Sequence, residues 1–232
     1  MRHADSEDLK IADGVYQVAG GDITDGADAA AFLLALAQPV LIDTGAGRSI
    51  DKVVENIRAT GVDPADVKSI ILTHNHIDHV GGAPYLRERF GARLVMHELD
   101  APAVRSGDGR ATAAEMYGVS FPPTPVDVSF SEEEYRLPLG DDVLVLLHTP
   151  GHTPGSISPY IDLGGRRILF AQDVHGPFMA AFGSDIDQWR QSMERLVALA
   201  PDILCEGHFG IYEPKDRAVA YVRGYLDRYA RH

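Results

Sequence analysis

The sequence predicts an α/β fold in a single domain. The chain has 232 residues, which is long for one domain and short for two. Hydrophobic residues make up 45% of it and charged residues 24%, the balance of an ordinary globular protein. Short apolar runs of strand type alternate along the chain with segments in which apolar residues recur at helical spacing. This alternation is typical of the α/β class.

The first hundred residues contain the clearest elements. Strands are predicted at residues 15–18, within 29–37, and at 40–42, 70–72 and 94–96. Between them, Ile50, Val53 and Ile57 recur at helical spacing after Ser49, a predicted N-cap, and the pattern stops at Gly61. A second, shorter helix is predicted at residues 84–90.

The rest of the chain begins with an irregular stretch. Residues 101–127 are rich in Pro and Gly, which predicts an insertion with one short helix near residues 111–117. Strands are then predicted at residues 143–147, 156–161, 167–170 and 203–205. A helix should begin after Ser184, with Ser184 and Asp187 as its capping pair, and a last helix carries Val222 and Leu226.

Charge and composition limit the partners and the compartment. A net charge of −13 opposes nucleic-acid binding, which needs Lys and Arg to displace counterions. No apolar run approaches the roughly 18 residues of a membrane span, and residues 1–8 are acidic, unlike a signal peptide. The lone Cys205 cannot form an internal disulfide and is expected to be a small buried hydrophobe. We therefore expect a cytoplasmic protein with a small-molecule substrate, no nucleic acid and no membrane.

The strongest signal for chemistry is the run HxHxDH, formed by His74, His76, Asp78 and His79 directly after a predicted strand. Alternate spacing lets His74 and His76 point the same way, while Asp78 and His79 can face a second point nearby. Neutral imidazoles and a carboxylate suit zinc, iron or manganese far better than calcium. The run therefore predicts metal ligands.

Three further candidate ligands each follow a predicted strand. They are His152 in Thr-Pro-Gly-His-Thr, Asp173, and His208 in Glu-Gly-His. Strand exits are where catalytic residues collect in layered α/β folds.

These motifs, in this order and together with Asp43 in Leu-Ile-Asp-Thr-Gly, resemble those of the metallo-β-lactamase superfamily over nearly the whole chain. The resemblance implies a four-layer αββα sandwich of two mixed β-sheets flanked by helices. It also implies a ligand set: one metal ion on His74, His76 and His152, the other on Asp78, His79 and His208, with Asp173 bridging them. Asp43 would support these ligands from behind.

A hydrolase follows from this ligand set. Two divalent cations about 3.5–4 Å apart can share a water and lower its pKa toward about 7. We expect two zinc ions, with iron or manganese as alternatives, and a metal-bound hydroxide that attacks a small ester, lactone, thioester or amide. Asp78 is the candidate catalytic residue, which would orient the nucleophile and pass a proton to the leaving group. The alternatives are a persulfide dioxygenase with a single iron and a metal-binding protein without turnover.

Departures from known branches of the superfamily narrow the choice. β-Lactamases usually have Cys or Ser at the position of Asp173, and acyl homoserine lactonases usually have a Tyr shortly after that aspartate, where this chain has Val174, His175 and Phe178. Glyoxalase II-like enzymes carry a helical domain beyond the position of His208, and ribonuclease Z-like members need a basic surface. We expect none of these four activities to be the main one.

The remaining histidines and one apolar loop have no role assigned by these motifs. His97 and His148 match no ligand motif, so structural hydrogen bonds are expected for both. His175 could contact substrate or cap a turn, and the sequence favours neither. The apolar run at residues 176–183 could form a pocket wall, an ordinary packed loop or a dimer contact. A homodimer is therefore one possible state.

Overall fold

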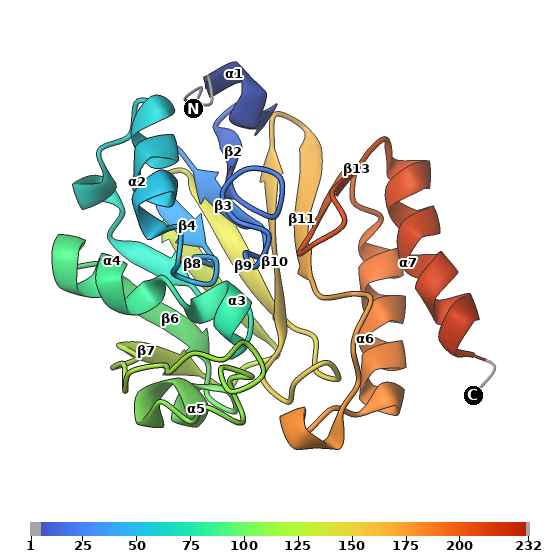
Figure 1. Cartoon of the computed structure of the whole chain (residues 1–232). Helices are drawn as coiled ribbons and strands as arrows, with labels where there is room; N and C mark the ends of the chain where they lie inside the picture. The colour runs from blue at the N-terminus through green and yellow to red at the C-terminus, as the bar shows by residue number, and fades with distance from the viewer. Residues whose placement is uncertain (1–5, 231–232) are drawn as a thin grey trace. The chain divides into compact units, whose positions relative to one another are not determined.

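The computed structural model describes residues 6–230, and it shows two compact units, Met1–Phe130 and Ser131–His232. Each contains one β-sheet and its own helices (Figure 1). We call them the N-terminal unit and the C-terminal unit. Residues 1–5 lie outside the described residues, so the expectation about a signal peptide falls largely there. The single domain and its insertion at residues 101–127 stay predictions.

The N-terminal unit is built on a mixed sheet whose seven strands follow chain order. The pairs from β1 to β4 are antiparallel, and the pairs from β4 to β7 are parallel. The strands are β1 (Lys10–Ala12), β2 (Val15–Ala19), β3 (Ala31–Leu34), β4 (Val40–Ile42), β5 (Ser69–Ile71), β6 (Arg93–His97) and β7 (Val128–Phe130). Parallel strands bring their carboxyl ends to one edge of the sheet, and the loop after β5 leaves from that edge.

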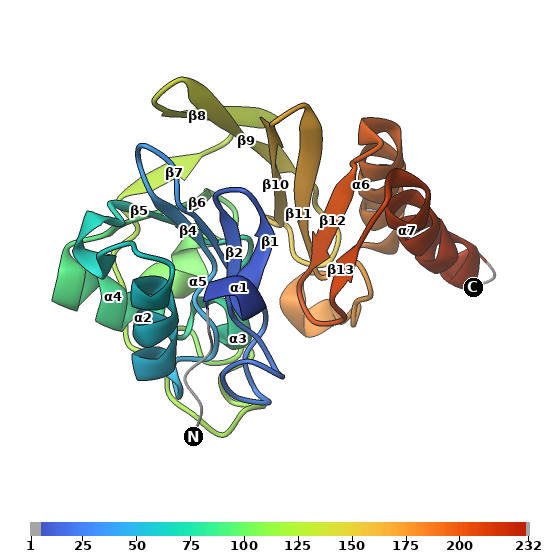
Figure 2. The ribbon, with the colours of Figure 1, turned by 90° about the horizontal axis from the view of Figure 1, so that it is seen from above.

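Helices pack on one side of this sheet, as Figure 2 shows for α2 and α4. The register places Leu33, Leu41, Ile70 and Leu94 side by side across four strands, where they pack in one apolar cluster with Ile57. The helical segments are α1 (Ser6–Leu9), α2 (Ile50–Ala59), η1 (Pro64–Asp66), α3 (Ile77–Val80), α4 (Ala83–Phe90) and α5 (Ala101–Ser106). The predicted helices at residues 50–57 and 84–90 are therefore confirmed.

The predicted N-cap of α2 is confirmed in position, since Ser49 is the N-cap residue, but its hydroxyl donates to Asp28 and accepts no backbone N–H of the helix. The predicted short helix was wrong, because residues 111–117 form turns. There the Asp108 carboxylate accepts from the backbone N–H groups of Arg110 and Ala111, and Ala113 has φ +58°. Side-chain bonds of this kind replace helical ones, and a left-handed residue interrupts a helix.

The C-terminal unit has a six-stranded mixed sheet in the order β13-β12-β11-β10-β9-β8, in which β11 and β12 are the parallel pair. Its strands are β8 (Glu134–Leu139), β9 (Asp142–His148), β10 (Ile157–Leu163), β11 (Arg166–Gln172), β12 (Ile203–Glu206) and β13 (Ile211–Tyr212). The sequence predicted β9, β10, β11 and β12 in this unit and missed β8 and β13, and in the N-terminal unit it missed β1 and β7. Of the missed strands, β8 alternates exposed with half-buried residues, and β13 has only two residues.

Helices α6 (Ile186–Leu199) and α7 (Lys215–Tyr229) lie side by side and pack on this second sheet (Figure 1). Trp189 and Met193 of α6 share an apolar cluster with Leu169 and Leu204, which are paired on neighbouring strands. A further segment, η2 (Ala180–Phe182), precedes α6. Two mixed sheets flanked by helices confirm the predicted α/β class. Among residues 6–230, no helix is both long enough and apolar enough to span a membrane.

The cap of α6 differs from the prediction. Asp185 is the N-cap, and its carboxylate accepts from the backbone N–H groups of Asp187 and Gln188 at 2.9 and 3.0 Å. The hydroxyl of Ser184 instead donates to the carbonyl of His152 at 2.6 Å. The serine therefore fastens a candidate ligand loop to the helix start.

Candidate metal centre

The four residues of the HxHxDH run lie together in the N-terminal unit. They follow the end of β5, and His76 is the N-cap residue of α3, the short helix that carries Asp78 and His79. All four residues are buried, with exposed fractions of 0–6% for the whole residue. Burial of polar groups is costly unless they are hydrogen-bonded or hold an ion, so this cluster needs compensating partners.

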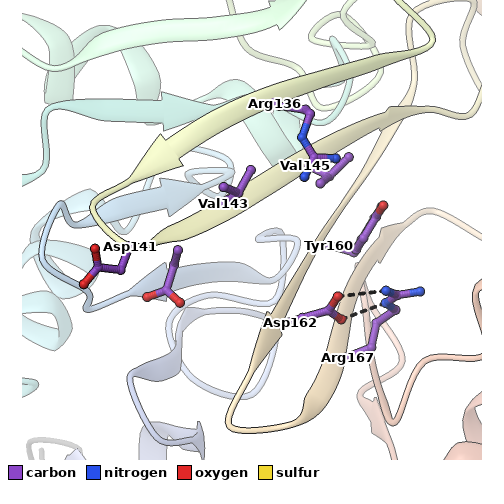
Figure 3. A pocket seen from close by; sticks show the side chains of 8 residues that line it. Arg136, Asp141, Val143, Val145, Tyr160, Asp162 and Arg167 are labelled. Carbon is purple, nitrogen blue, oxygen red and sulfur yellow. Dashed lines mark hydrogen bonds and ion pairs between the residues drawn. The ribbon is translucent and has the colours of Figure 1, made fainter.

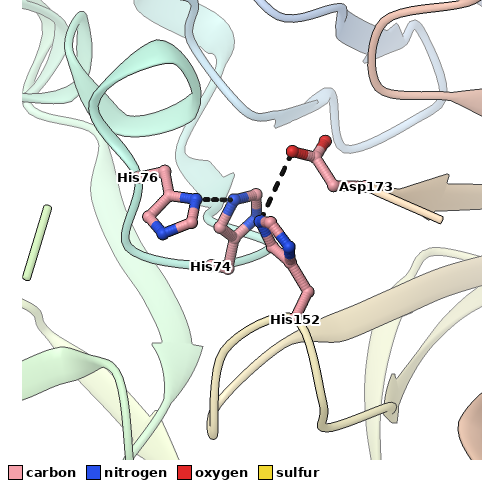
Figure 4. Close-up of side chains that lie close together, drawn as sticks. All are labelled: His74, His76, His152 and Asp173. Atoms are coloured by element: carbon pink, nitrogen blue, oxygen red, sulfur yellow. Dashed lines mark hydrogen bonds and ion pairs between the residues drawn. The ribbon is translucent and has the colours of Figure 1, made fainter. Parts of the chain in front are cut away.

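His74 and His76 place two ring nitrogens close together. His74 Nε2 lies 3.1 Å from His76 Nδ1, the contact drawn between these rings in Figure 4. On its other side, His74 Nδ1 lies 3.2 Å from the Thr73 hydroxyl oxygen. Because that hydroxyl has one proton and gives it to Asp43, it must accept from His74 Nδ1. His74 therefore carries its proton on Nδ1 and presents a lone pair at Nε2.

Asp43 organises both ends of this run. Its carboxylate accepts from the Thr73 backbone N–H at 2.8 Å and from the Thr73 hydroxyl at 2.7 Å. The same carboxylate lies 2.8 Å from Nδ1 of His79, so a neutral His79 donates from Nδ1 and leaves Nε2 as its lone-pair nitrogen. The sequence predicted Asp43 as a support for the ligands, and these contacts are those of such a support.

The backbone at Asp43 has φ +58°, in the left-handed region. Few residues adopt this conformation, and Asp and Asn do so most readily among those with a side chain. The conformation turns the chain directly after β4, and the Asp43 backbone N–H still donates to the Ile71 carbonyl of the neighbouring strand. Strained residues of this kind cluster at functional sites.

Asp78 lies on α3 beside His79, with Oδ2 3.9 Å from His79 Nε2. The turn that carries them is held by residues far along the chain. Asp100 accepts from the Asn75 backbone N–H at 3.1 Å, and the Thr112 carbonyl accepts from the Ile77 backbone N–H at 2.7 Å. The irregular segment after β6 therefore fixes the start of α3 and the position of the metal-binding candidates on it.

Three predicted ligands lie together in the C-terminal unit, centred on Asp173. One carboxylate oxygen, Oδ2, lies 3.4 Å from His152 Nε2, as Figure 4 shows. The other, Oδ1, lies 3.3 Å from His208 Nε2. His152 is fully buried, whereas the His208 side chain is 25% exposed. Each oxygen of Asp173 therefore faces a different histidine.

A bulge at the end of β11 aims Asp173. The pairing of β11 with β12 shifts register between Phe170 and Gln172, and Gln172 has φ +49°. The Gln172 side-chain oxygen accepts from the Asp173 backbone N–H at 2.8 Å. Bulges commonly re-aim a side chain next to a site. Asp43 and Gln172 thus share a left-handed backbone conformation, which turns the chain sharply at the end of a strand in each unit.

His152 is placed by the contact between its loop and α6. Gly151 has φ +135°, and a Cβ on it would lie 2.3 Å from the backbone nitrogen and Cα of Trp189. Its carbonyl accepts from the Asp185 backbone N–H at 2.9 Å, while Ser192 donates to the Pro150 carbonyl at 2.7 Å. Only glycine lets the loop approach the helix this closely.

Glu206 is a functional candidate that sequence reasoning missed. It is 1% exposed, and its Oε2 accepts from the backbone N–H groups of His208 and Phe209 at 2.6 and 2.8 Å. Its Oε1 lies 2.8 Å from Nδ1 of His175. The signal available in the sequence was only its position, at the end of a predicted buried strand and two residues before a predicted ligand, where a carboxylate needs partners.

The donor spacings fit a metal ion of tetrahedral preference. Zinc–nitrogen and zinc–oxygen bonds of about 2.0–2.2 Å place neighbouring donors roughly 3.3 Å apart at tetrahedral angles. The separations of 3.1, 3.4 and 3.3 Å match this value, and the two at Asp173 exceed the usual 2.7–2.9 Å of a charge-assisted hydrogen bond. Imidazole and carboxylate donors also suit zinc, iron or manganese. The described residues thus include His/Asp groups that could hold metal ions.

The other candidates have structural contacts. His97 Nδ1 accepts from the Leu99 backbone N–H at 3.3 Å, and His148 Nε2 lies 2.9 Å from the Pro154 carbonyl, so both make the predicted structural bonds. Cys205 is buried, and burial raises the pKa of its thiol, as expected for an inert hydrophobe. In the 176–183 loop, Phe178 packs against Trp189 with ring centroids 5.1 Å apart. That contact is the packed-loop alternative, while a pocket wall stays a prediction.

A groove in the C-terminal unit lies away from these ligands. Its volume is about 340 Å³, and it follows the outer residues of β8–β11 (Figure 3). Arg167 crosses it, bonded through two nitrogens to Asp162 at 2.8 Å each and stacked 4.9 Å from the centre of the Tyr160 ring. None of the predicted ligands lines it, so it is not the candidate centre.

Comparison with known proteins gives consistent relatives. The family model described as the metallo-beta-lactamase superfamily matches residues 37–208. The probable metallo-hydrolase YflN of Bacillus subtilis (strain 168) is 28% identical over 200 residues, 73% of this chain and 74% of the relative. The hydroxyacylglutathione hydrolase of Cereibacter sphaeroides is 31% identical over 143 residues, 60% of this chain and 47% of the relative.

Solved structures agree with the sequence matches. A HARLDQ-motif mutant of a metallo-β-lactamase from Cronobacter sakazakii has a TM-score of 0.80 at 25% identity, covering 96% of this chain and 94% of that one. BJP-1, a subclass B3 metallo-β-lactamase of Bradyrhizobium japonicum, has a TM-score of 0.75 at 26% identity, covering 94% and 90%. The similarity confirms the predicted fold.

Proposed function

The chain belongs to the metallo-β-lactamase superfamily, and from this premise we propose that it is a hydrolase that uses two divalent metal ions, zinc first. The substrate class is a small ester, lactone, thioester or amide. In this proposal His74, His76 and His152 would hold one ion, and Asp78, His79 and His208 would hold the other. Asp173 would contribute to both.

One observation carries the proposal of two ions rather than one. The two oxygens of Asp173 face two different histidines, His152 at 3.4 Å and His208 at 3.3 Å. A carboxylate that served a single ion would need only one of these contacts. A bridging carboxylate needs both, each at the separation expected between neighbouring donors of one ion.

When bound, two such cations supply Lewis acidity and lower the pKa of a shared water. The residues of the chain then have separable tasks. Asp43 keeps the protons of His74 and His79 on Nδ1, directly for His79 and through Thr73 for His74. Their Nε2 atoms are thereby held as lone-pair donors, which is the usual role of a carboxylate behind a ligating histidine.

Asp78 is the proposed proton carrier. Its side chain is 8% exposed, and its Oδ2 lies 3.9 Å from His79 Nε2, so it would stand beside the donor atoms proposed for the second ion. It would accept the proton of the shared water and deliver it to the leaving alcohol, thiol or amine. This general acid–base step typically contributes 10²–10⁴-fold to a rate.

The test combines metal analysis with a substrate panel. We expect about two equivalents of zinc, iron or manganese by elemental analysis, and chelator-sensitive hydrolysis of at least one lactone, thioester or aryl ester. Asp78→Asn should lower kcat by about 10²-fold or more while KM changes little. Asp66→Asn, an exposed aspartate of the N-terminal unit, is the matched control and should retain full activity.

Other outcomes point to the alternatives. A single iron with oxygen consumption and no hydrolysis would replace the hydrolase by a dioxygenase. Metal-loaded protein that is silent across the panel would favour a binding protein without turnover.

A further inference from the structure

A histidine outside the family ligand set joins the C-terminal half of the centre. His175, Asp173 and His208 each offer one donor atom, and these atoms lie within 4.8 Å of one another. The rings of His175 and His208 have centroids 5.2 Å apart and are nearly perpendicular. With side chains 18% and 25% exposed, both histidines are accessible to an ion from solvent.

Glu206 determines which nitrogen of His175 can bind a ligand. Its Oε1 lies 2.8 Å from Nδ1 of His175, so a neutral imidazole donates from Nδ1 and keeps its lone pair at Nε2. A carboxylate behind the far nitrogen is the arrangement that commonly accompanies metal-ligating histidines. The same carboxylate accepts the backbone N–H of His208, so one buried acid orients two of the three candidate ligands.

The surroundings of His175 fix its ring. The Phe209 ring lies 4.6 Å from it, at an interplanar angle of 75°, and the Tyr229 hydroxyl donates to the His175 carbonyl at 3.0 Å. A histidine that merely capped a turn would bond through its ring to a local backbone group. Here the ring is held by a buried acid and an aromatic side chain.

From these contacts we propose that His175 is an additional metal ligand. With Asp173 and His208 it forms a three-ligand site within the C-terminal unit for a zinc-like divalent ion, and positions remain open for water or substrate. The site shares two ligands with the proposed dinuclear centre and in that respect rests on the proposed function. It makes a separate statement, however, because the C-terminal unit should bind one ion without any histidine from the N-terminal unit.

Removing the three N-terminal histidines tests this statement in the full-length chain. The variant His74→Ala/His76→Ala/His79→Ala, with folding checked by circular dichroism, is titrated with Co²⁺ and followed by visible absorption. We expect one Co²⁺ per chain. Adding His175→Ala should weaken binding by more than about 100-fold, because loss of an orienting partner alone costs 10–100-fold.

Two controls separate ligand loss from general damage. In the same background, His148→Gln should leave Co²⁺ affinity unchanged, since it retains a donor toward Pro154. Tyr229→Phe removes a support of the His175 backbone without removing a ligand and should change affinity only a few-fold. Absence of Co²⁺ binding in the folded triple variant, or equal affinity with and without His175, overturns the proposal.

The two proposals can fail separately. A native chain that binds two ions and hydrolyses esters, while the triple variant binds none, retains the hydrolase and removes this site. If the triple variant binds Co²⁺ through His175 but the native protein hydrolyses no substrate of the panel, this site is retained and the hydrolase is rejected. If the triple variant does not fold, anomalous diffraction from cobalt-soaked native crystals decides. A peak about 2.0–2.2 Å from a His175 nitrogen supports the proposal, and its absence there refutes it.

Discussion

Replacing Asp43 by Asn should move the ring proton of His79 from Nδ1 to Nε2 while leaving the fold nearly intact. The introduced amide can place its oxygen toward the Thr73 backbone N–H and its NH₂ group where Oδ2 of Asp43 now lies, beside the Thr73 hydroxyl and His79 Nδ1. An NH₂ group donates, so His79 must accept at Nδ1 and carry its proton on Nε2. That nitrogen is the one proposed to bind metal.

The magnitudes follow from the bonds that change. Asparagine tolerates the φ of +58°, so backbone strain adds little. The bond from the Thr73 backbone N–H loses its charged acceptor and the two bonds at Oδ2 reverse direction, which together cost about 1–3 kcal/mol of unfolding free energy. Loss of an orienting carboxylate typically lowers metal affinity by 10–100-fold. Asp43→Ala removes the acceptor from three buried donors and strains the backbone, and it should cost about 3–5 kcal/mol.

The assay pairs two measurements on the same variants. Zinc affinity is measured by competition with a chromophoric chelator, and the stability of the metal-free protein by urea unfolding. The Asp43→Asn protein should keep most of its stability and lose zinc affinity, and exposed Asp66→Asn should change neither. Native zinc affinity in a folded Asp43→Asn protein would refute the tautomer argument.

Three further predictions address packing, pH and accessibility. Gly151→Ala forces a Cβ to 2.3 Å from the Trp189 backbone at φ +135°, so it should cost at least about 3 kcal/mol in thermal or urea unfolding; a loss below about 1 kcal/mol would contradict the close contact between loop and helix. Hydrogen bonds from Arg167 hold the pKa of Asp162 below its usual 3.8, so this pair stabilises the fold above that pH and loses its contribution as the pH falls through the lowered value. Because the Asp162 side chain is 58% exposed, Asp162→Asn should cost less than about 1 kcal/mol at pH 6 and less at pH 2 than at pH 6, as measured by urea unfolding at both. The buried Cys205 thiol, whose pKa burial raises, should resist iodoacetamide in the native protein and react after unfolding, as read by mass spectrometry.

Sequence reasoning succeeded where the physical signal is local and strong. The long buried strands and the amphipathic helices have apolar periods that few other structures produce. The ligand candidates were also accessible to it, since His and Asp in fixed spacing after a strand are chemically distinctive. Which of them lie together within a unit followed from the shared edge of each sheet.

The wrong local predictions at the helix starts and in the irregular segment have a common cause, which is competition from other hydrogen-bond partners. Ser49 and Ser184 are plausible caps by type, yet Asp28 and the His152 carbonyl offer their hydroxyls partners that come from elsewhere in the fold. Asp108 similarly replaces helical bonds in the irregular segment. The pairing of Glu206 with His175 joins residues on two different strand exits, and no local pattern encodes it.

The closeness of the Gly151 loop to α6 has a practical result. Trp189 is the single tryptophan of the chain, and its indole nitrogen donates to the Val174 carbonyl at 3.1 Å, one residue beyond Asp173. Its backbone abuts the loop of His152. The molecule therefore contains its own fluorophore at the junction of two candidate ligand loops, and its emission reports on them without a label or a second chromophore.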